Sequence, residues 1–217
     1  MARGLLLVLL VALAACLAGC GGNDESGTVD EEASPTAAEV TAVRETIDAG
    51  VKEIEPSDCK RLYTQGFLER VAAFERNDAL QLCEEKAEYR HGGYPREVTV
   101  SRVRIEDDEA TADAAFEGGD LRDQAIRFAL VREQGRWKID RMVEFVEYDR
   151  AKLIEGLRRE MRELEKAGLE PEVGACLVEG FEGLGDDDLR NLSLFNDLDP
   201  GQEIAEGCEE ELGALDL

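Results

Sequence analysis

Residues 97–147 alternate between apolar and polar side chains with a period of two, which is typical of half-buried β-strands. Each run places its apolar residues on one face of the predicted sheet. These are Ala110, Ala112, Ala114 and Phe116, then Ile126, Phe128 and Leu130, and last Trp137, Ile139, Val143 and Phe145. Together with an apolar run that begins near residue 97, they predict four antiparallel strands.

Turn residues separate these runs. The first turn is expected at 106–109, and the second opens at Gly118-Gly119-Asp120. Gln134-Gly135 has the pattern of a two-residue hairpin, because glycine readily takes the positive φ that such a turn needs. The first strand changes its apolar phase midway, which predicts a β-bulge near Ser101-Arg102. Such a bulge would also help the sheet to curve.

Apolar residues at helical spacing precede the sheet. They predict one helix across 37–55 that Pro56 ends, a short helix that starts at Ser57-Asp58, and a third from about 77 to about 89. Asn77 is the expected cap of the third helix. The first half of the chain therefore predicts helices that cover one face of the sheet.

The chain continues after the sheet with an amphipathic helix from about Asp149 to Lys166, which Gly168 is expected to stop. Two or three short helices follow in this tail. We therefore expect an α+β fold, with helices packed on a curved antiparallel four-stranded sheet in 36–148. A small all-α module is expected in 149–217.

The N-terminus has the pattern of a secretory signal, with Arg3, an apolar run at 5–17 and then small residues. The run is too short for a comfortable membrane span. It ends in Leu17-Ala18-Gly19-Cys20, which resembles the lipobox of bacterial lipoproteins. The resemblance implies a signal peptide at 1–19, cleavage before Cys20 and a diacylglyceryl thioether on its sulfur. The alternative is an ordinary cleaved signal with a chance cysteine.

Leu13-Ala14-Ala15-Cys16 also fits the lipobox pattern, but apolar residues follow it, whereas Cys20 is followed at once by polar ones. Residues 20–35 would then be a lipidated cysteine and a flexible acidic linker with a reach of roughly 20 Å. These features predict a protein that acyl chains hold on the extracytoplasmic side of the cell membrane.

The 217-residue chain has a formal net charge of −25. Residues 167–217 hold fifteen acidic residues against one base, Arg190, a net charge of −14. This charge argues against nucleic acid as a partner and against electrostatic docking on anionic lipid. A solvated surface explains it, and so does a surface that attracts a basic partner or cations.

Several helices followed by a curved antiparallel sheet resemble the NTF2-like superfamily, which has a cystatin-like α+β cone. The match is best at 58–68 and in the hairpin 128–140, where Gly135-Arg136-Trp137-Lys138-Ile139 leads into the last strand. It covers roughly 36–148 and implies that the interior of a cone can hold a ligand or an active site. The chain departs from the family pattern because no hairpin is evident between the early helices.

NTF2-like enzymes use Asp, His or Tyr inside the cone, which makes Asp140, Tyr63 and Tyr94 the candidates here, with Trp137 in the same candidate pocket. Arg141 shares the phase of Ile139 and Val143. It would either point inward, where it could hold an anionic group, or lie exposed at a bulge, since arginine is rarely fully buried.

The sequence assigns no catalytic residue, metal ligand or cofactor. The single histidine, His91, supplies neither a triad nor a zinc set and is expected in a turn. The acidic tail fails the EF-hand pattern, because aligning Gly201 with the loop glycine places Leu198 and Pro200 at ligand positions.

The mature chain would hold five cysteines, of which lipidation removes Cys20. The other four are expected to pair outside the cytoplasm, with reduced buried thiols as the alternative. Pairing within each module predicts structural disulfides at Cys59–Cys83 and Cys176–Cys208.

These observations favour a non-enzymatic lipoprotein that binds a small ligand or a basic protein partner at the cell envelope. The alternative is an NTF2-like small-molecule enzyme or ligand carrier that uses the cone interior. A cone filled by Trp137, Phe128 and Phe116 would favour the interaction module, whereas Asp or Tyr inside an open cone with Arg141 would favour the enzyme or the carrier.

Overall fold

The computed structural model describes residues 35–52, 54–72, 78–88 and 93–208. These ranges belong to the compact unit that begins at Pro35. Cys20, the linker up to residue 34 and His91 therefore lie outside the described residues. Within the described ranges, no helix is both long and apolar enough to cross a membrane.

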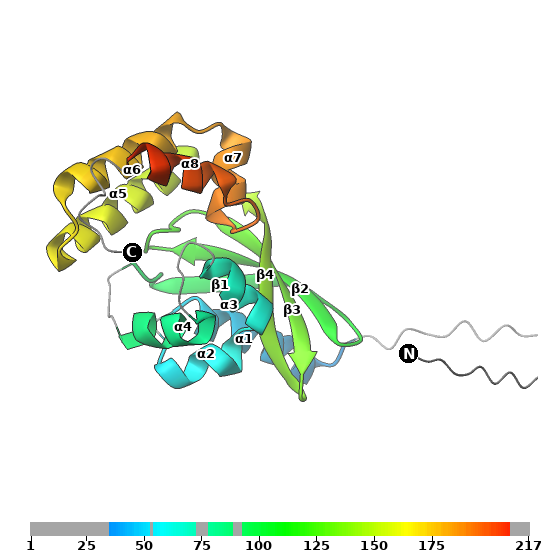
Figure 1. Cartoon of the computed structure of the whole chain (residues 1–217). Coiled ribbons are helices and arrows are strands. Elements are labelled where there is room, and N and C mark those ends of the chain that lie inside the picture. Colours follow the sequence, from blue (N-terminus) through cyan, green and yellow to red (C-terminus); the bar gives the residue numbers. More distant parts are fainter. Residues whose placement is uncertain (1–34, 53, 73–77, 89–92, 209–217) are drawn as a thin grey trace, which may run out of the picture. The chain divides into compact units, whose positions relative to one another are not determined.

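Four antiparallel strands form one sheet in chain order, as the alternation predicts (Figure 1). They are β1 (Glu97–Glu106), β2 (Glu109–Glu117), β3 (Ala125–Glu133) and β4 (Arg136–Glu147). The turns fall where the turn residues predict them. Gln134 and Gly135 have φ angles of 52° and 75°, which match the tight hairpin expected there.

Both edge strands carry bulges. The pairing of β1 with β2 shifts between Ser101 and Arg104, and Arg102 has a φ of 50°, so the bulge predicted in the first strand is confirmed. β4 carries three more, which the alternation did not predict. Leu130 and Ala129 of β3 pair with Ile139 and Arg141, so that one residue of β4 is left over between them.

The extra residues of β4 are Asp140, Val143 and the residue before Glu147. The first of them changes the phase of the strand, and the prediction that Val143 lies on the core face is therefore wrong. Met142 takes that position and is 8% exposed.

The outer edge of β4 is covered by polar donors from elsewhere in the chain. The backbone N–H of Thr64 donates to the carbonyl of Ile139 at 3.0 Å. The Arg70 guanidinium donates to the carbonyl of Asp140, and the Asn196 side-chain amide donates to that of Val143 at 3.3 Å. Two of the three bulge residues thus have a partner for their carbonyl groups.

Helices α1 (Ala37–Gly50), α2 (Pro56–Leu62), α3 (Gln65–Val71) and α4 (Ala79–Glu88) pack on one face of the sheet (Figure 1). Where the sequence predicts one short helix after Pro56, the structure has two, because Tyr63 and Thr64 are extended. The Thr64 hydroxyl then accepts a hydrogen bond from the backbone of Phe67 and caps α3.

The first helix ends at Gly50, five residues earlier than predicted. The Tyr63 hydroxyl donates to the carbonyl of Gly50, which is one of the last-turn carbonyls that a helix leaves without a partner. Val51 and Ile54 still pack against the core, but outside the helix. The predicted cap of α4, Asn77, lies outside the described residues, and the Asp78 carboxylate accepts hydrogen bonds from the first backbone N–H groups there.

The core lies between α1–α4 and the sheet. Phe116, Phe128 and Trp137 are 2%, 2% and 6% exposed, and the two phenylalanine rings meet edge to face with centroids 6.4 Å apart. Val43 and Ile47 of α1 pack against them from the helical side and are fully buried. The predicted α+β architecture is thus confirmed.

The chain continues into α5 (Arg150–Ala167), α6 (Pro171–Gly183), α7 (Asp186–Ser193) and α8 (Asp199–Gly207). The first of them starts at its Asp149 cap and stops at Gly168, which has a φ of 116°, as predicted. A second small core joins Leu153, Ile154 and Leu189 to Phe145 of the sheet.

Both disulfides are present in the predicted pairing. Cys59–Cys83 joins α2 to α4, and Cys176–Cys208 joins α6 to the residue that follows α8. The division of the chain at residue 148 stays a prediction.

Candidate functional site

Of the residues proposed for a cone pocket, Tyr63 and Tyr94 line one small cavity, whereas Asp140, Arg141 and Trp137 do not line it. Trp137 is buried, with the Arg132 guanidinium 4.5 Å above its ring centroid. Tyr63 donates its hydroxyl to the backbone, and burial raises the pKa of this hydroxyl well above its usual value. It therefore stays protonated and acts as a structural donor. The Asp140 carboxylate accepts the Thr64 hydroxyl at 3.0 Å.

Arg141 lies on the outer face of the sheet, opposite Ala129, and its side chain is 57% exposed. The bulge at Asp140 puts it there, so of the two positions considered for Arg141 the structure has the exposed one. The same outer face holds Asp113, which is 4% exposed between Arg102 and Arg127. Hydrogen bonds from Arg127 hold the pKa of Asp113 below its usual value.

A small cavity of about 170 Å³ remains among α1–α4, beside Tyr63, Phe67 and Tyr94. Ligand pockets usually measure about 300–1,000 Å³. This volume is therefore too small for an ordinary ligand, and aromatic and aliphatic side chains fill the remaining interior.

A cavity of about 510 Å³ lies between the sheet and the C-terminal helices. We call it the inter-layer cavity. Its lining comes from the loop after β2, from β4 and from all four C-terminal helices. The lining residues are Asp120, Leu121, Met142, Leu153, Leu157, Glu160, Leu177, Phe181, Leu189, Leu192, Ser193, Phe195, Gly201 and Ala205.

The sheet contributes Met142 to the inter-layer cavity. Met142 reaches it only because the bulge at Asp140 turns this side chain to the core face. Polar groups are few in the lining: Asp120, Glu160 and Ser193. The Ser193 hydroxyl donates to the backbone of Leu189 at 2.7 Å, so it is already satisfied within its own helix.

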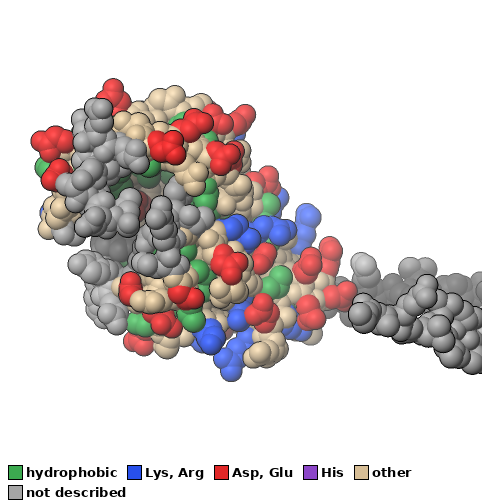
Figure 2. Space-filling view, viewed as in Figure 1, with side chains coloured by type: hydrophobic (Ala, Val, Ile, Leu, Met, Phe, Trp, Pro, Cys, Tyr) green, Lys and Arg blue, Asp and Glu red, His purple; other side chains and the backbone are tan. Residues whose placement is uncertain are grey.

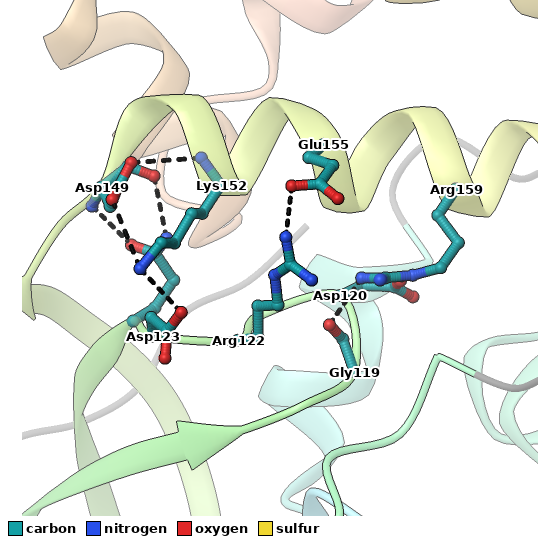
Figure 3. A network of polar contacts seen from close by, with 9 residues as sticks. Gly119, Asp120, Arg122, Asp123, Asp149, Lys152, Glu155 and Arg159 are labelled. Carbon is teal, nitrogen blue, oxygen red and sulfur yellow. Dashed lines mark hydrogen bonds and ion pairs between the residues drawn. The ribbon is translucent and has the colours of Figure 1, made fainter.

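Ion pairs hold α5 against the loop between β2 and β3 (Figure 3). Arg159 donates to the Asp120 carboxylate at 2.8 Å and to the carbonyl of Gly119 at 2.6 Å. Lys152 pairs with Asp123 at 2.7 Å, and its hydrogen bond holds the pKa of that carboxyl below its usual value. These contacts fix the position of one cavity wall.

Two further contacts make this attachment tight. The buried Gln124 side chain bonds both backbone groups of Asp149, donating to its carbonyl and accepting from its N–H at 2.8 and 2.9 Å. At Gly156 of α5, a Cβ atom would lie 2.1 Å from the carbonyl oxygen of Asp120. The loop and the helix therefore touch backbone to backbone.

The helices that the sequence predicted after the sheet supply most of the apolar lining of this cavity, including Leu153, Leu157, Phe181, Leu189 and Leu192. Sequence reasoning missed Met142, Leu121 and the cavity itself. A cavity depends on how the sheet and several helices pack together. The spacing of apolar residues within one helix does not predict that packing.

The fold and the cavity define an α+β protein with a four-stranded antiparallel sheet, a disulfide-linked helical region at its C-terminus and an apolar site between them. No family model, curated protein or solved structure matches this chain. Among the described residues, no group of three or more His, Cys, Asp or Glu side chains is arranged to hold a metal ion.

Proposed function

We propose that this protein is a cell-envelope lipoprotein whose NTF2-like α+β domain and acidic helical tail form a non-enzymatic binding module. The filled interior supports this reading over the enzyme alternative. Phe116, Phe128 and Trp137 occupy the space between sheet and helices, Arg141 lies on the outer face, and Asp140 already accepts a hydrogen bond from Thr64. An enzyme of the NTF2-like type would need polar groups around an open interior.

The binding site of this module is the inter-layer cavity, and its ligand is an apolar small molecule or an alkyl chain. One observation carries the proposal: the sheet and four helices together leave a volume of about 510 Å³ whose lining is almost entirely aliphatic and aromatic. This volume lies within the usual range for ligand sites, which are mostly apolar with a few polar groups.

Filling the cavity should weaken binding of an apolar ligand. Ala205 lines it from α8, so Ala205→Phe is expected to weaken binding of the uncharged dye N-phenyl-1-naphthylamine by about tenfold or more. The measurement is dye fluorescence against concentration of the whole mature chain, produced without acylation so that no detergent is present.

The matched control is Ala151→Phe, which adds the same ring at an exposed position of α5 outside the cavity. It should leave dye binding unchanged. Equal binding by the Ala205→Phe protein and the parent, with both folded by circular dichroism, would show that the dye does not enter this cavity.

The proposed anchor is tested separately. Cys20→Ala removes the sulfur that would carry the diacylglyceryl group. It is expected to move the protein out of the membrane fraction or to leave an unprocessed precursor, because the apolar run at 5–17 is too short to span comfortably. Fractionation and intact-mass measurement of the parent and the variant decide this, and an unacylated parent that begins elsewhere would refute the anchor.

A further inference from the structure

We infer that the inter-layer cavity takes the unbranched alkyl chain of an amphiphile tail first and leaves the head group at a solvent-exposed end. The site would then select for an apolar tail and not for the charge of the head group. This inference rests on the proposed function, because it names the class of ligand for the same site and the ligand's orientation. It follows from the burial of the lining residues and from the partners of the polar ones.

The burial of the lining residues changes along α5. Leu153 is 3% exposed and packs against the fully buried Leu189 of α7. Leu157, one turn further on, is partly buried, and Glu160 is exposed. The helix rises about 10 Å from Leu153 to Glu160. The cavity therefore has a closed apolar end, where Met142 of the sheet is also buried, and an open end beside Glu160.

Each polar side chain of the described lining already interacts with another part of the protein. The Asp120 carboxylate accepts a hydrogen bond from Arg159 at 2.8 Å, so that a carboxylate and a guanidinium lie together at the same wall. Their opposite charges largely cancel for a head group nearby. The Ser193 hydroxyl donates within its own helix, and Glu160 also has an interaction partner. These side chains therefore give little advantage to either sign of charge on a head group.

The size and the closed end of the cavity suit an alkyl chain. A cavity of about 150 Å³ lined by Leu, Ile and Phe can hold benzene. The inter-layer cavity measures about 510 Å³ and so has room for a longer apolar group. At its closed end, Met142, Leu153 and Leu189 offer no strong hydrogen-bond partner. A polar group buried there would lose its water without compensation, whereas a head group at the open end keeps its water.

Three ten-carbon ligands test the inference by displacing the dye from the whole mature chain at pH 7: decylammonium, decanoate and 10-hydroxydecanoate. Acidic side chains are spread over the surface of the C-terminal helices, so the buffer contains about 0.5 M NaCl to screen their field (Figure 2). Decylammonium and decanoate are expected to bind within about threefold of each other, because exposed, paired charges contribute little. 10-Hydroxydecanoate should bind about tenfold more weakly than decanoate, since its terminal hydroxyl would be buried without a partner.

Each result bears on a different part of the inference. A difference of about tenfold or more between decylammonium and decanoate would overturn the indifference to head-group charge. Equal binding of decanoate and 10-hydroxydecanoate would overturn the tail-first orientation. If the dye binds in the cavity and none of the three displaces it, the site takes compact apolar molecules and the inference is wrong. A dye that does not bind in the cavity would instead refute the proposed function.

Met142→Gln tests where the tail ends. The amide would give the closed end a hydrogen-bond partner, so the preference for decanoate over 10-hydroxydecanoate should fall several-fold. The matched control is Met161→Gln, the same change at a residue of α5 that is 9% exposed and outside the cavity lining, and it should keep the preference of the parent. A folded Met142→Gln protein with the parent's preference would contradict the orientation. If Met142→Gln does not fold, the ligand series on the parent decides the inference.

Discussion

A protein in which Cys176 and Cys208 are both serine is expected to lose about 3–4 kcal/mol of its free energy of unfolding. The crosslink closes a loop with a sequence separation of 32, and removing it restores conformational freedom to the unfolded chain. Most of the loss is expected in the C-terminal helices, because their own core is small, with Leu153, Ile154 and Leu189 at its centre.

Two measurements separate this local effect from a general one. Urea denaturation gives the change in unfolding free energy, and amide hydrogen exchange should show the largest loss of protection in α6–α8. The Cys59→Ser/Cys83→Ser protein is the control, because it removes a crosslink of similar sequence separation between α2 and α4, outside the C-terminal helices. Exchange that rises equally in the sheet, or a change below about 1 kcal/mol, would contradict the expectation.

Gly156→Ala is expected to destabilise the protein by about 2 kcal/mol or more, although alanine is the better helix former by about 1 kcal/mol. The added Cβ would lie 2.1 Å from the carbonyl oxygen of Asp120, which belongs to backbone and cannot turn aside. The loop and α5 would have to separate, and the Arg159–Asp120 pair would be strained with them. Dye binding should fall together with stability, since this contact forms a wall of the inter-layer cavity.

Gly183→Ala provides the comparison. This glycine ends α6, and a Cβ there would meet nothing within 4 Å. The same chemical change should therefore be neutral or slightly stabilising in thermal unfolding. If both variants melted at the same temperature, the close approach at Gly156 would not exist in solution.

Alternation of residue type predicted the sheet well where pairing is regular. β2 and β3 pair without shifts, and their buried faces were predicted residue by residue. In β4 the predicted core face is confirmed at Trp137, Ile139 and Phe145 and is wrong at Val143. A bulge adds one residue without any mark in the hydrophobic pattern, and Val143 appeared to continue the alternation that Met142 in fact takes over.

The end of α1 and the cavity escaped prediction for a related reason, since both depend on contacts between distant residues. Gly50 ends its helix where the hydroxyl of Tyr63 reaches its carbonyl. Met142 and Leu189 line one cavity although 47 positions separate them in the sequence. The disulfides were predictable because four cysteines allow few pairings, and pairing those close together in the sequence gives the two disulfides observed.

The covered edge of β4 limits how another protein can bind to this one. An open strand edge exposes unpaired backbone groups, which invite pairing with a strand of a neighbouring chain. Here Thr64, Arg70 and Asn196 already occupy the outward carbonyls of Ile139, Asp140 and Val143. A partner cannot extend the sheet at these positions by adding a strand of its own. Recognition on this side must therefore rely on side chains, and copies of the chain cannot associate by backbone pairing at these positions.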